Sequence, residues 1–254
     1  MTRFQFERGA DRLGSAEVGR LDAARARFDK PLCIDADPKD RAASIREIAK
    51  RRARVAAAVA ELDLTDLISQ AIDDRIGTGP AFRLTERLLT DQRLAGLEQE
   101  LLGPLISNPR SGEMVKGHAV VLADLGLCPY RGRVVRDPHL FDGSKSREAR
   151  RDHILWRMAL TQEIWANAQG PTVYRVVSSD HGIEPASLSL VSGTFSEAVA
   201  ESHIGGGTTR RHSKLITRSL PLHRLFMTFL ETEAMNEPYR EAEAHFVGSP
   251  GSVL

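Results

Sequence analysis

The sequence has few cysteines, no long apolar run and no excess of charge of either sign. Its two cysteines, Cys33 and Cys128, cannot form a disulfide framework and do not have the spacing of a metal site. No stretch approaches the roughly 18 apolar residues of a membrane-spanning helix. The 35 basic and 34 acidic side chains give a formal net charge of +1, so overall charge favours neither nucleic acid nor an anionic membrane as a partner. With 254 residues, the chain is expected to form one large domain or two small ones.

The first twelve residues, MTRFQFERGADR, are polar and charged, and they lack the apolar segment of a secretory signal peptide. Together with the low cysteine content, this predicts a cytoplasmic protein, or one delivered into a host cell without a cleavable signal. The sequence does not choose between these two locations.

Helical periodicity marks the first hundred or so residues. One helix is expected to begin at Asp40 as its N-cap, a shorter one to cover 64–76, and a third to follow Gly79-Pro80 and end near Gly103-Pro104. The first of them places five apolar residues on one stripe: Ile45, Ile48, Val55, Val59 and Leu62. The sequence therefore predicts a helical N-terminal region, residues 1–115, whose role it does not reveal and which could bind a partner or a chaperone.

Beyond a linker rich in Pro and Gly, at 104–118, strand-like and helix-like segments alternate. One clear helix is expected at about 147–168. Residues 118–136 contain two short apolar runs, and strands are expected at 172–177, 186–192, 214–219 and 240–248. The predicted fold class is α+β, with the helical region followed by a second domain at residues 116–254.

Three short segments of this second domain carry residues suited to chemistry. The first is Val173-Tyr174-Arg175, in which an arginine stands among apolar residues of a strand. Burying a guanidinium there is costly unless an anion meets it, and its planar fork suits a phosphate or a carboxylate. Arg175 is therefore a candidate anion-binding residue, although a structural ion pair would also explain it.

The second segment is Ser192-Gly193-Thr194-Phe195-Ser196, at the end of a strand and before the helix-like residues 197–202. Alternate residues of an extended chain point the same way, so the hydroxyls of Ser192 and Thr194 can hold one ligand or one carboxylate. Serine and threonine also cap helices, so this segment alone is weak evidence for a site.

The third segment is Glu241-Ala242-Glu243, at the start of the strand expected at 240–248. A two-residue period would place both carboxylates, and His245, on one face of the sheet. Because like charges repel, we expect the pKa of one of the two carboxyl groups to rise. Such a pair is rarely chosen for stability, although on an exposed strand face it would be unremarkable.

In this order the three segments resemble the mono-ADP-ribosyltransferases of the Arg–Ser–Glu type, which occur in bacterial toxins and effectors, phage proteins and vertebrate ecto-enzymes. The resemblance covers about residues 147–248. It implies a split mixed β-sandwich for the second domain and transfer of ADP-ribose from NAD, as substrate, to an arginine of a target protein. No metal is expected, because the sequence shows no metal-ligand motif.

The resemblance also implies a role for each matching residue. Arg175 would bind the phosphates of NAD, and Ser192 would orient the catalytic glutamate and the nicotinamide ribose. Thr194 would support that strand, and Tyr174 and Phe195 would contact the dinucleotide. Glu243 would stabilise the positive ribosyl centre formed as nicotinamide leaves, while Glu241 would face the acceptor and help to deprotonate it.

Two residues depart from the family pattern. Val176 stands where the family usually has a glycine after the arginine, and Gly193 stands where it has the middle threonine of Ser-Thr-Ser. These departures leave open an inactive transferase fold that acts as a binding module. A second arginine with a following glycine, Tyr130-Arg131-Gly132, precedes the long helix and so lies outside the expected order.

A basic cluster in the second domain leaves a further alternative, an ADP-ribosyltransferase directed to nucleic acid. It follows the glycine run 205–207 and consists of Arg210, Arg211, His212 and Lys214. The near-neutral net charge argues against this alternative.

Overall fold

The long helix α2 (Pro38–Ala60) begins at Asp37, whose carboxylate accepts a hydrogen bond from the backbone N–H of Lys39 at 2.7 Å. Pro38 occupies the first helical turn, where its missing N–H costs nothing. The cap is thus three residues earlier than the expected Asp40, which lies in the first turn. Ile48, Val55 and Val59 are buried as predicted, whereas Ile45 is 53% exposed.

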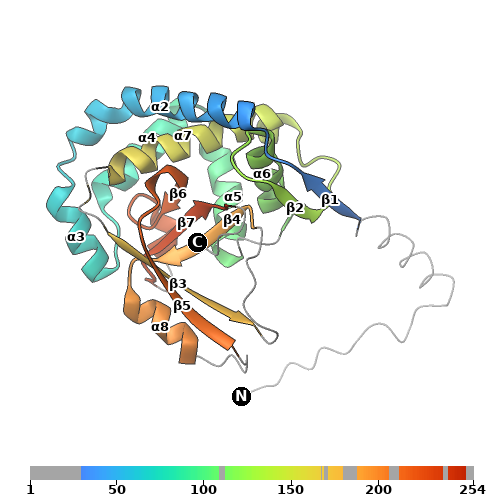
Figure 1. Ribbon diagram of the computed structural model, residues 1–254. Coiled ribbons are helices and arrows are strands. Elements are labelled where there is room, and N and C mark those ends of the chain that lie inside the picture. The colour runs from blue at the N-terminus through green and yellow to red at the C-terminus, as the bar shows by residue number, and fades with distance from the viewer. Residues whose placement is uncertain are drawn as a thin grey trace, which may run out of the picture.

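The computed structural model describes residues 30–108, 112–166, 168, 171–179, 188–205, 212–236 and 240–249, which form an α+β fold (Figure 1). Among the described residues, α2 is followed by α3 (Thr65–Asp74), α4 (Gly79–Asp91), α5 (Ala95–Ser107) and α6 (Glu113–Asp124). None of the described helices is both long and apolar enough to cross a bilayer.

One expectation for this region is wrong. The helix expected from Gly79-Pro80 to Gly103-Pro104 is two helices, and α5 continues through Pro104 because Leu101 and Leu105 on either side are buried. The apolar run that begins at residue 118 forms most of α6. The run from 118 to 123 is buried throughout, and a continuous apolar run does not distinguish a buried strand from a buried helix.

The main sheet has five antiparallel strands in the order β5-β3-β4-β7-β6. Their bounds are β3 (Thr172–Ser179), β4 (Leu190–Thr194), β5 (His212–Ser219), β6 (Leu225–Thr228) and β7 (Glu243–Val247). A mixed sandwich was expected, but every strand pair in the described part of the chain is antiparallel. The short helix α8 (Glu197–Gly205) follows β4, as the sequence predicted.

The second sheet consists of β1 (Pro31–Ile34) and β2 (Tyr130–Arg133). Arg131 lies here, where its guanidinium donates to the carbonyl oxygen of Ile34 at 3.0 Å and pairs with Asp35. The competing arginine is therefore held in a different sheet from Arg175.

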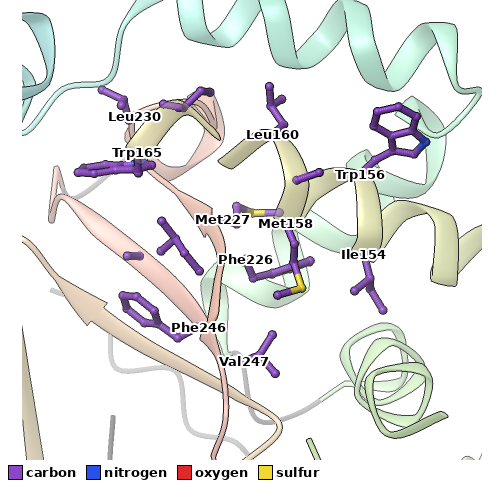
Figure 2. Close-up of a cluster of buried hydrophobic side chains, with 14 of the residues drawn as sticks. Ile154, Trp156, Met158, Leu160, Trp165, Phe226, Met227, Leu230, Phe246 and Val247 are labelled. Atoms are coloured by element: carbon purple, nitrogen blue, oxygen red, sulfur yellow. The ribbon is translucent and has the colours of Figure 1, made fainter. Parts of the chain in front are cut away.

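Helix α7 (Arg147–Trp165), predicted at 147–168, packs on α2 on one side and on β6 on the other. Figure 2 shows its Ile154, Met158 and Leu160 together with Phe226 and Phe246 of the sheet. One continuous cluster of buried apolar side chains extends from Ile48 in α2 to Val247 in β7. The boundary expected between residues 115 and 116 falls inside α6, and the hydrophobic core crosses it.

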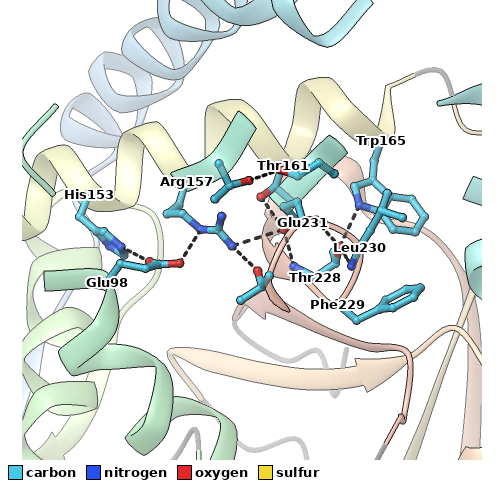
Figure 3. A network of polar contacts seen from close by, with 12 residues as sticks. Glu98, His153, Arg157, Thr161, Trp165, Thr228, Phe229, Leu230 and Glu231 are labelled. Atoms are coloured by element: carbon cyan, nitrogen blue, oxygen red, sulfur yellow. Dashed lines mark hydrogen bonds and ion pairs between the residues drawn. The ribbon is translucent and has the colours of Figure 1, made fainter. Parts of the chain in front are cut away.

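A chain of buried polar side chains also joins the N-terminal helices to the sheet (Figure 3). Glu98 of α5 pairs with His153 and lies 3.5 Å from Nε of Arg157, both on α7. Arg157 Nη2 donates to Thr232 at 2.6 Å and lies 3.4 Å from Glu231, beyond the end of β6. Burial alone would raise the pKa of Glu98, but Arg157 and His153 lower it below its usual value.

Candidate active site

A solvent-open pocket of about 150 Å³ lies where β3, β4, α8 and the start of β7 meet. Six of its lining residues were predicted as site residues from the sequence: Tyr174, Arg175, Ser192, Thr194, Glu241 and Glu243. Of the predicted site residues, Phe195 is absent from the lining, and the remaining lining residues are Val176, Gly193, Val199, Ala200 and His203. Three segments spread over about seventy positions therefore meet at one place.

Arg175 lies in the middle of β3, between the edge strand β5 and the central strand β4. Its Cα partner across the sheet in β5 is Ile216, and its side chain is only 7% exposed. The guanidinium Nη1 donates to the backbone carbonyl oxygen of Ser192 at 2.6 Å. This bond fixes the cation against β4, on the wall of the pocket.

Thr194 ties the end of β4 to the loop that carries the first glutamate. Its hydroxyl donates to the carbonyl oxygen of Glu241 and accepts from the backbone N–H of Ser196 at 3.0 Å. In the strand register, Thr194 pairs with Glu243, and Ser192 pairs with His245. The hydroxyl segment and the two glutamates are thus held next to each other by β4, β7 and the turn before β7.

The strand expected from residue 240 begins only at Glu243, so the two-residue period does not explain the position of Glu241. Arg240 and Ala242 both have a φ of +48°, in the left-handed region that residues with a Cβ rarely adopt. The backbone turns there, and both glutamates still line the pocket. Left-handed residues other than glycine are costly and are concentrated at functional sites.

Glu243 is in an unusual electrostatic environment. Burial and the neighbouring Glu241 carboxylate together raise the pKa of Glu243 to about 8, as the sequence predicted for one member of the pair. His245 Nε2 lies 3.4 Å from Glu243 Oε1, and burial lowers the pKa of His245 to about 3. His245 is therefore neutral near pH 7 and supplies no positive charge to the glutamate. A cation entering the pocket would favour the charged form of Glu243.

His203 was missed by the sequence prediction. It lines the pocket from α8, with its Nε2 3.7 Å from Glu241 Oε1. Val199 and His203 are four residues apart and lie on the same face of the helix. The segment after Thr194 reads as a helix, so this spacing is the signal that could have identified His203.

Phe195 is a correction to the predicted site. The structure places it in the core, 4% exposed and stacked on Trp165 with ring centroids 4.3 Å apart. Thr194 and Phe195 are consecutive, so when the threonine faces the pocket the phenylalanine faces away from it. Tyr174, by contrast, does line the pocket.

Packing explains why a glycine occupies position 193. A Cβ built at this position would lie 2.9 Å from Val173 Cγ1 and 3.2 Å from the carbonyl oxygen of Tyr174. The neighbouring strand β3 therefore leaves no room for the threonine side chain.

Replacing Gly193 with Thr is expected to lower the free energy of unfolding by about 1–3 kcal/mol, because the added atoms overpack the contact with β3. Urea unfolding measures the effect. Gly96→Thr is the control, since nothing lies within 4 Å of a Cβ at Gly96 in α5, and its effect should stay within about 0.5 kcal/mol. Equal stability of the Gly193 variant and the native protein would contradict this packing explanation.

Part of the predicted basic cluster lies outside the described residues, namely Arg210 and Arg211, whereas His212 and Lys214 are exposed on β5. Among the residues that the structure describes, no three His, Cys, Asp or Glu side chains gather in a way that could hold a metal ion.

Comparisons of this chain with protein-family models, with curated proteins and with solved structures found no match.

Proposed function

We propose that this protein is a mono-ADP-ribosyltransferase that moves ADP-ribose from NAD to an arginine side chain of a target protein and releases nicotinamide. The observation that carries the proposal is the convergence of a buried arginine, two hydroxyl residues and two glutamates on one pocket. A split sandwich of the transferase type, formed around this pocket, is part of the same proposal.

The electrostatics of the pocket suit the two ends of NAD. Arg175 supplies a fixed positive charge for the phosphates, and its guanidinium is already oriented by the carbonyl oxygen of Ser192. Glu243 supplies a carboxyl group away from bulk water, where a positive centre is stabilised more strongly than in solution. Ser192 and Thr194 lie on the strand between these two charges.

The reaction breaks the N-glycosidic bond between ribose C1′ and the nicotinamide nitrogen, and the bonding electrons leave with nicotinamide. The positive charge that develops on the ribose is stabilised by the Glu243 carboxylate, the electrostatic contribution also seen in glycosidases. A nitrogen of the acceptor guanidinium then forms the new bond to C1′. Glu241, at the pocket wall beside His203, accepts the proton that this nitrogen loses.

The direct test uses NAD labelled in its ADP-ribose portion, incubated with the protein and a cell lysate, followed by mass spectrometry of every modified polypeptide. We expect label on arginine side chains in an amount matched by released nicotinamide. The binding-module alternative would be supported if NAD gave no transfer and no rise in the melting temperature, since a ligand bound only by the native state must stabilise that state. Transfer of label to RNA or DNA that becomes weaker as the salt concentration of the reaction rises would point to the nucleic-acid alternative.

Glu241 allows a prediction that separates two steps of the reaction. Glu241→Ala should reduce transfer to protein by at least about tenfold and leave hydrolysis of NAD to ADP-ribose and nicotinamide measurable, because only acceptor deprotonation is lost. Transfer and nicotinamide release are measured in the same samples. Equal loss of both activities would contradict the acceptor role of Glu241.

A further inference from the structure

A second pocket, of about 380 Å³, lies between α2, α7 and the short 3-10 helix η3 (Leu222–Arg224). We refer to it as the basic apolar pocket. It shares no lining residue with the candidate active site. Its lining residues are Arg41, Ile45, Ile48, Ala49, Arg52, Leu127, Met158, Gln162, Leu222, His223, Arg224 and Val247.

More than half of this lining is apolar and comes from elements that are far apart in the sequence. Ile48 of α2, Met158 of α7 and Val247 of β7 belong to the hydrophobic core, and Leu222 packs against it. Ile45 lines the pocket from α2 and is one of the most exposed large apolar side chains in the described part of the protein. An exposed isoleucine beside an apolar hollow favours an apolar occupant.

The charged part of the lining is entirely basic. Three arginines and one histidine line the pocket, and no aspartate or glutamate among the described residues does. Arg52 is neutralised by Glu163, with Nε and Oε2 2.9 Å apart. Arg224 is held in place by a hydrogen bond from its Nε to the carbonyl oxygen of Val247 at 2.7 Å. Arg41 is exposed on the first turn of α2.

The positive charges here act on one another. Burial lowers the pKa of His223, and the positive charges of Arg224 and Arg41 lower it further. Burial also lowers the pKa of Arg224; Cys128 opposes this shift, and Arg218 and Arg41 add smaller contributions to it. Bringing like charges together beside an apolar surface is costly, and an anion bound between them would offset that cost.

We propose that the basic apolar pocket binds a small amphipathic anion. Its body is aromatic or short and aliphatic, and it carries a single carboxylate, sulfonate or phosphate group. The body packs on Ile48, Met158 and Leu222, and the anionic group meets Arg41 and Arg224. This combination of a mainly apolar lining and a few convergent charges is typical of small-molecule sites. The proposal does not depend on the transferase activity.

The test uses a matched pair of fluorescent probes and the full chain. The anionic probe is 8-anilinonaphthalene-1-sulfonate, and the neutral probe is N-phenyl-1-naphthylamine, the same ring system without the sulfonate. We expect the sulfonate to bind at one site per chain and at least about tenfold more tightly than the neutral amine.

Two variants locate the site and identify the interaction. Arg41→Glu should weaken binding of the sulfonate at least about tenfold and leave the neutral probe within about twofold, while Arg54→Glu, an exposed change on the same helix, should affect neither. Ala49→Trp should block both probes, because the indole fills the pocket mouth. Far-ultraviolet circular dichroism checks that each variant is folded.

Four results would overturn the proposal. Absence of saturable sulfonate binding would exclude an anion site in the native protein. Equal affinity for both probes, or no effect of Arg41→Glu, would show that the pocket binds apolar molecules and does not recognise an anion. Undiminished binding to Ala49→Trp would place the probe elsewhere on the molecule.

Discussion

Glu243→Gln is expected to reduce transfer of ADP-ribose by at least about 100-fold, while the protein remains folded. The amide has nearly the same shape as the carboxyl group but cannot carry the negative charge that stabilises the ribosyl cation, and removal of one such electrostatic contribution typically costs about 10²–10³ in kcat. Transfer is measured with labelled NAD under saturating conditions.

Glu201→Gln on α8 is the matched control, because that carboxylate is exposed and does not line the pocket. It should retain activity within about twofold. Wild-type activity of the Glu243 variant would remove the proposed role of this residue, and with it the strongest support for the transferase.

The same variant has a second consequence, for stability. The folded-state pKa of Glu243, about 8, lies above the ordinary value of 4.5, so folding favours its neutral form. The stability that comes from this neutral form is fully present below pH 4.5 and is lost as the pH rises through 8. At about 1.4 kcal/mol per pKa unit, the largest loss of stability from this effect is roughly 5 kcal/mol.

Because a glutamine side chain stays neutral at every pH, the Glu243→Gln variant should be more stable than the native protein at pH 9 by a few kcal/mol. Near pH 4.5 the two should be nearly equal. Urea unfolding at the two pH values measures this difference. A native protein that is as stable as the variant at pH 9 would show that the carboxyl group is not held in its neutral form.

Arg157→Met is expected to lower the free energy of unfolding by about 3–5 kcal/mol. Arg157 is fully buried between Glu98 and Glu231, and its removal leaves those carboxyl groups without their shared cation. The methionine side chain nearly fills the space of the arginine, so the loss of stability comes from the missing charge more than from a cavity.

The matched control is Arg151→Met, an exposed change on the same helix α7, which should stay within about 0.5 kcal/mol. Both variants are measured by urea unfolding at pH 7. A cost below about 1 kcal/mol for Arg157→Met would show that the ion pairs of Figure 3 contribute little beyond their own desolvation.

The sequence predicted the elements around the pocket well, because their signals are local. Helix α7 and strands β3 and β5 have clear periodicity and Gly or Pro boundaries. The predicted residues Arg175 and Glu243 were recognised by residue type and order, which do not require knowledge of packing. The start of β7 was misplaced, because the left-handed conformation of Ala242 is set by the surrounding structure and not by alanine itself.

The buried polar network was not predicted, for a different reason. Glu98, His153 and Arg157 are of residue types that usually occupy the solvent-exposed face of a helix. Only the packing of α5 against α7, and of α7 against the end of β6, places them together out of water. The same limit applies to the basic apolar pocket, whose lining residues come from elements separated by about two hundred positions.

The continuous core between α2 and α7 restricts how the N-terminal helices can act. The inner face of α2 is occupied by α7, so any partner or chaperone that recognises α2 in the folded protein can reach only its outer surface. A chaperone that detached α2 would expose the side of α7 that α2 covers, opposite the side of α7 that packs on the sheet.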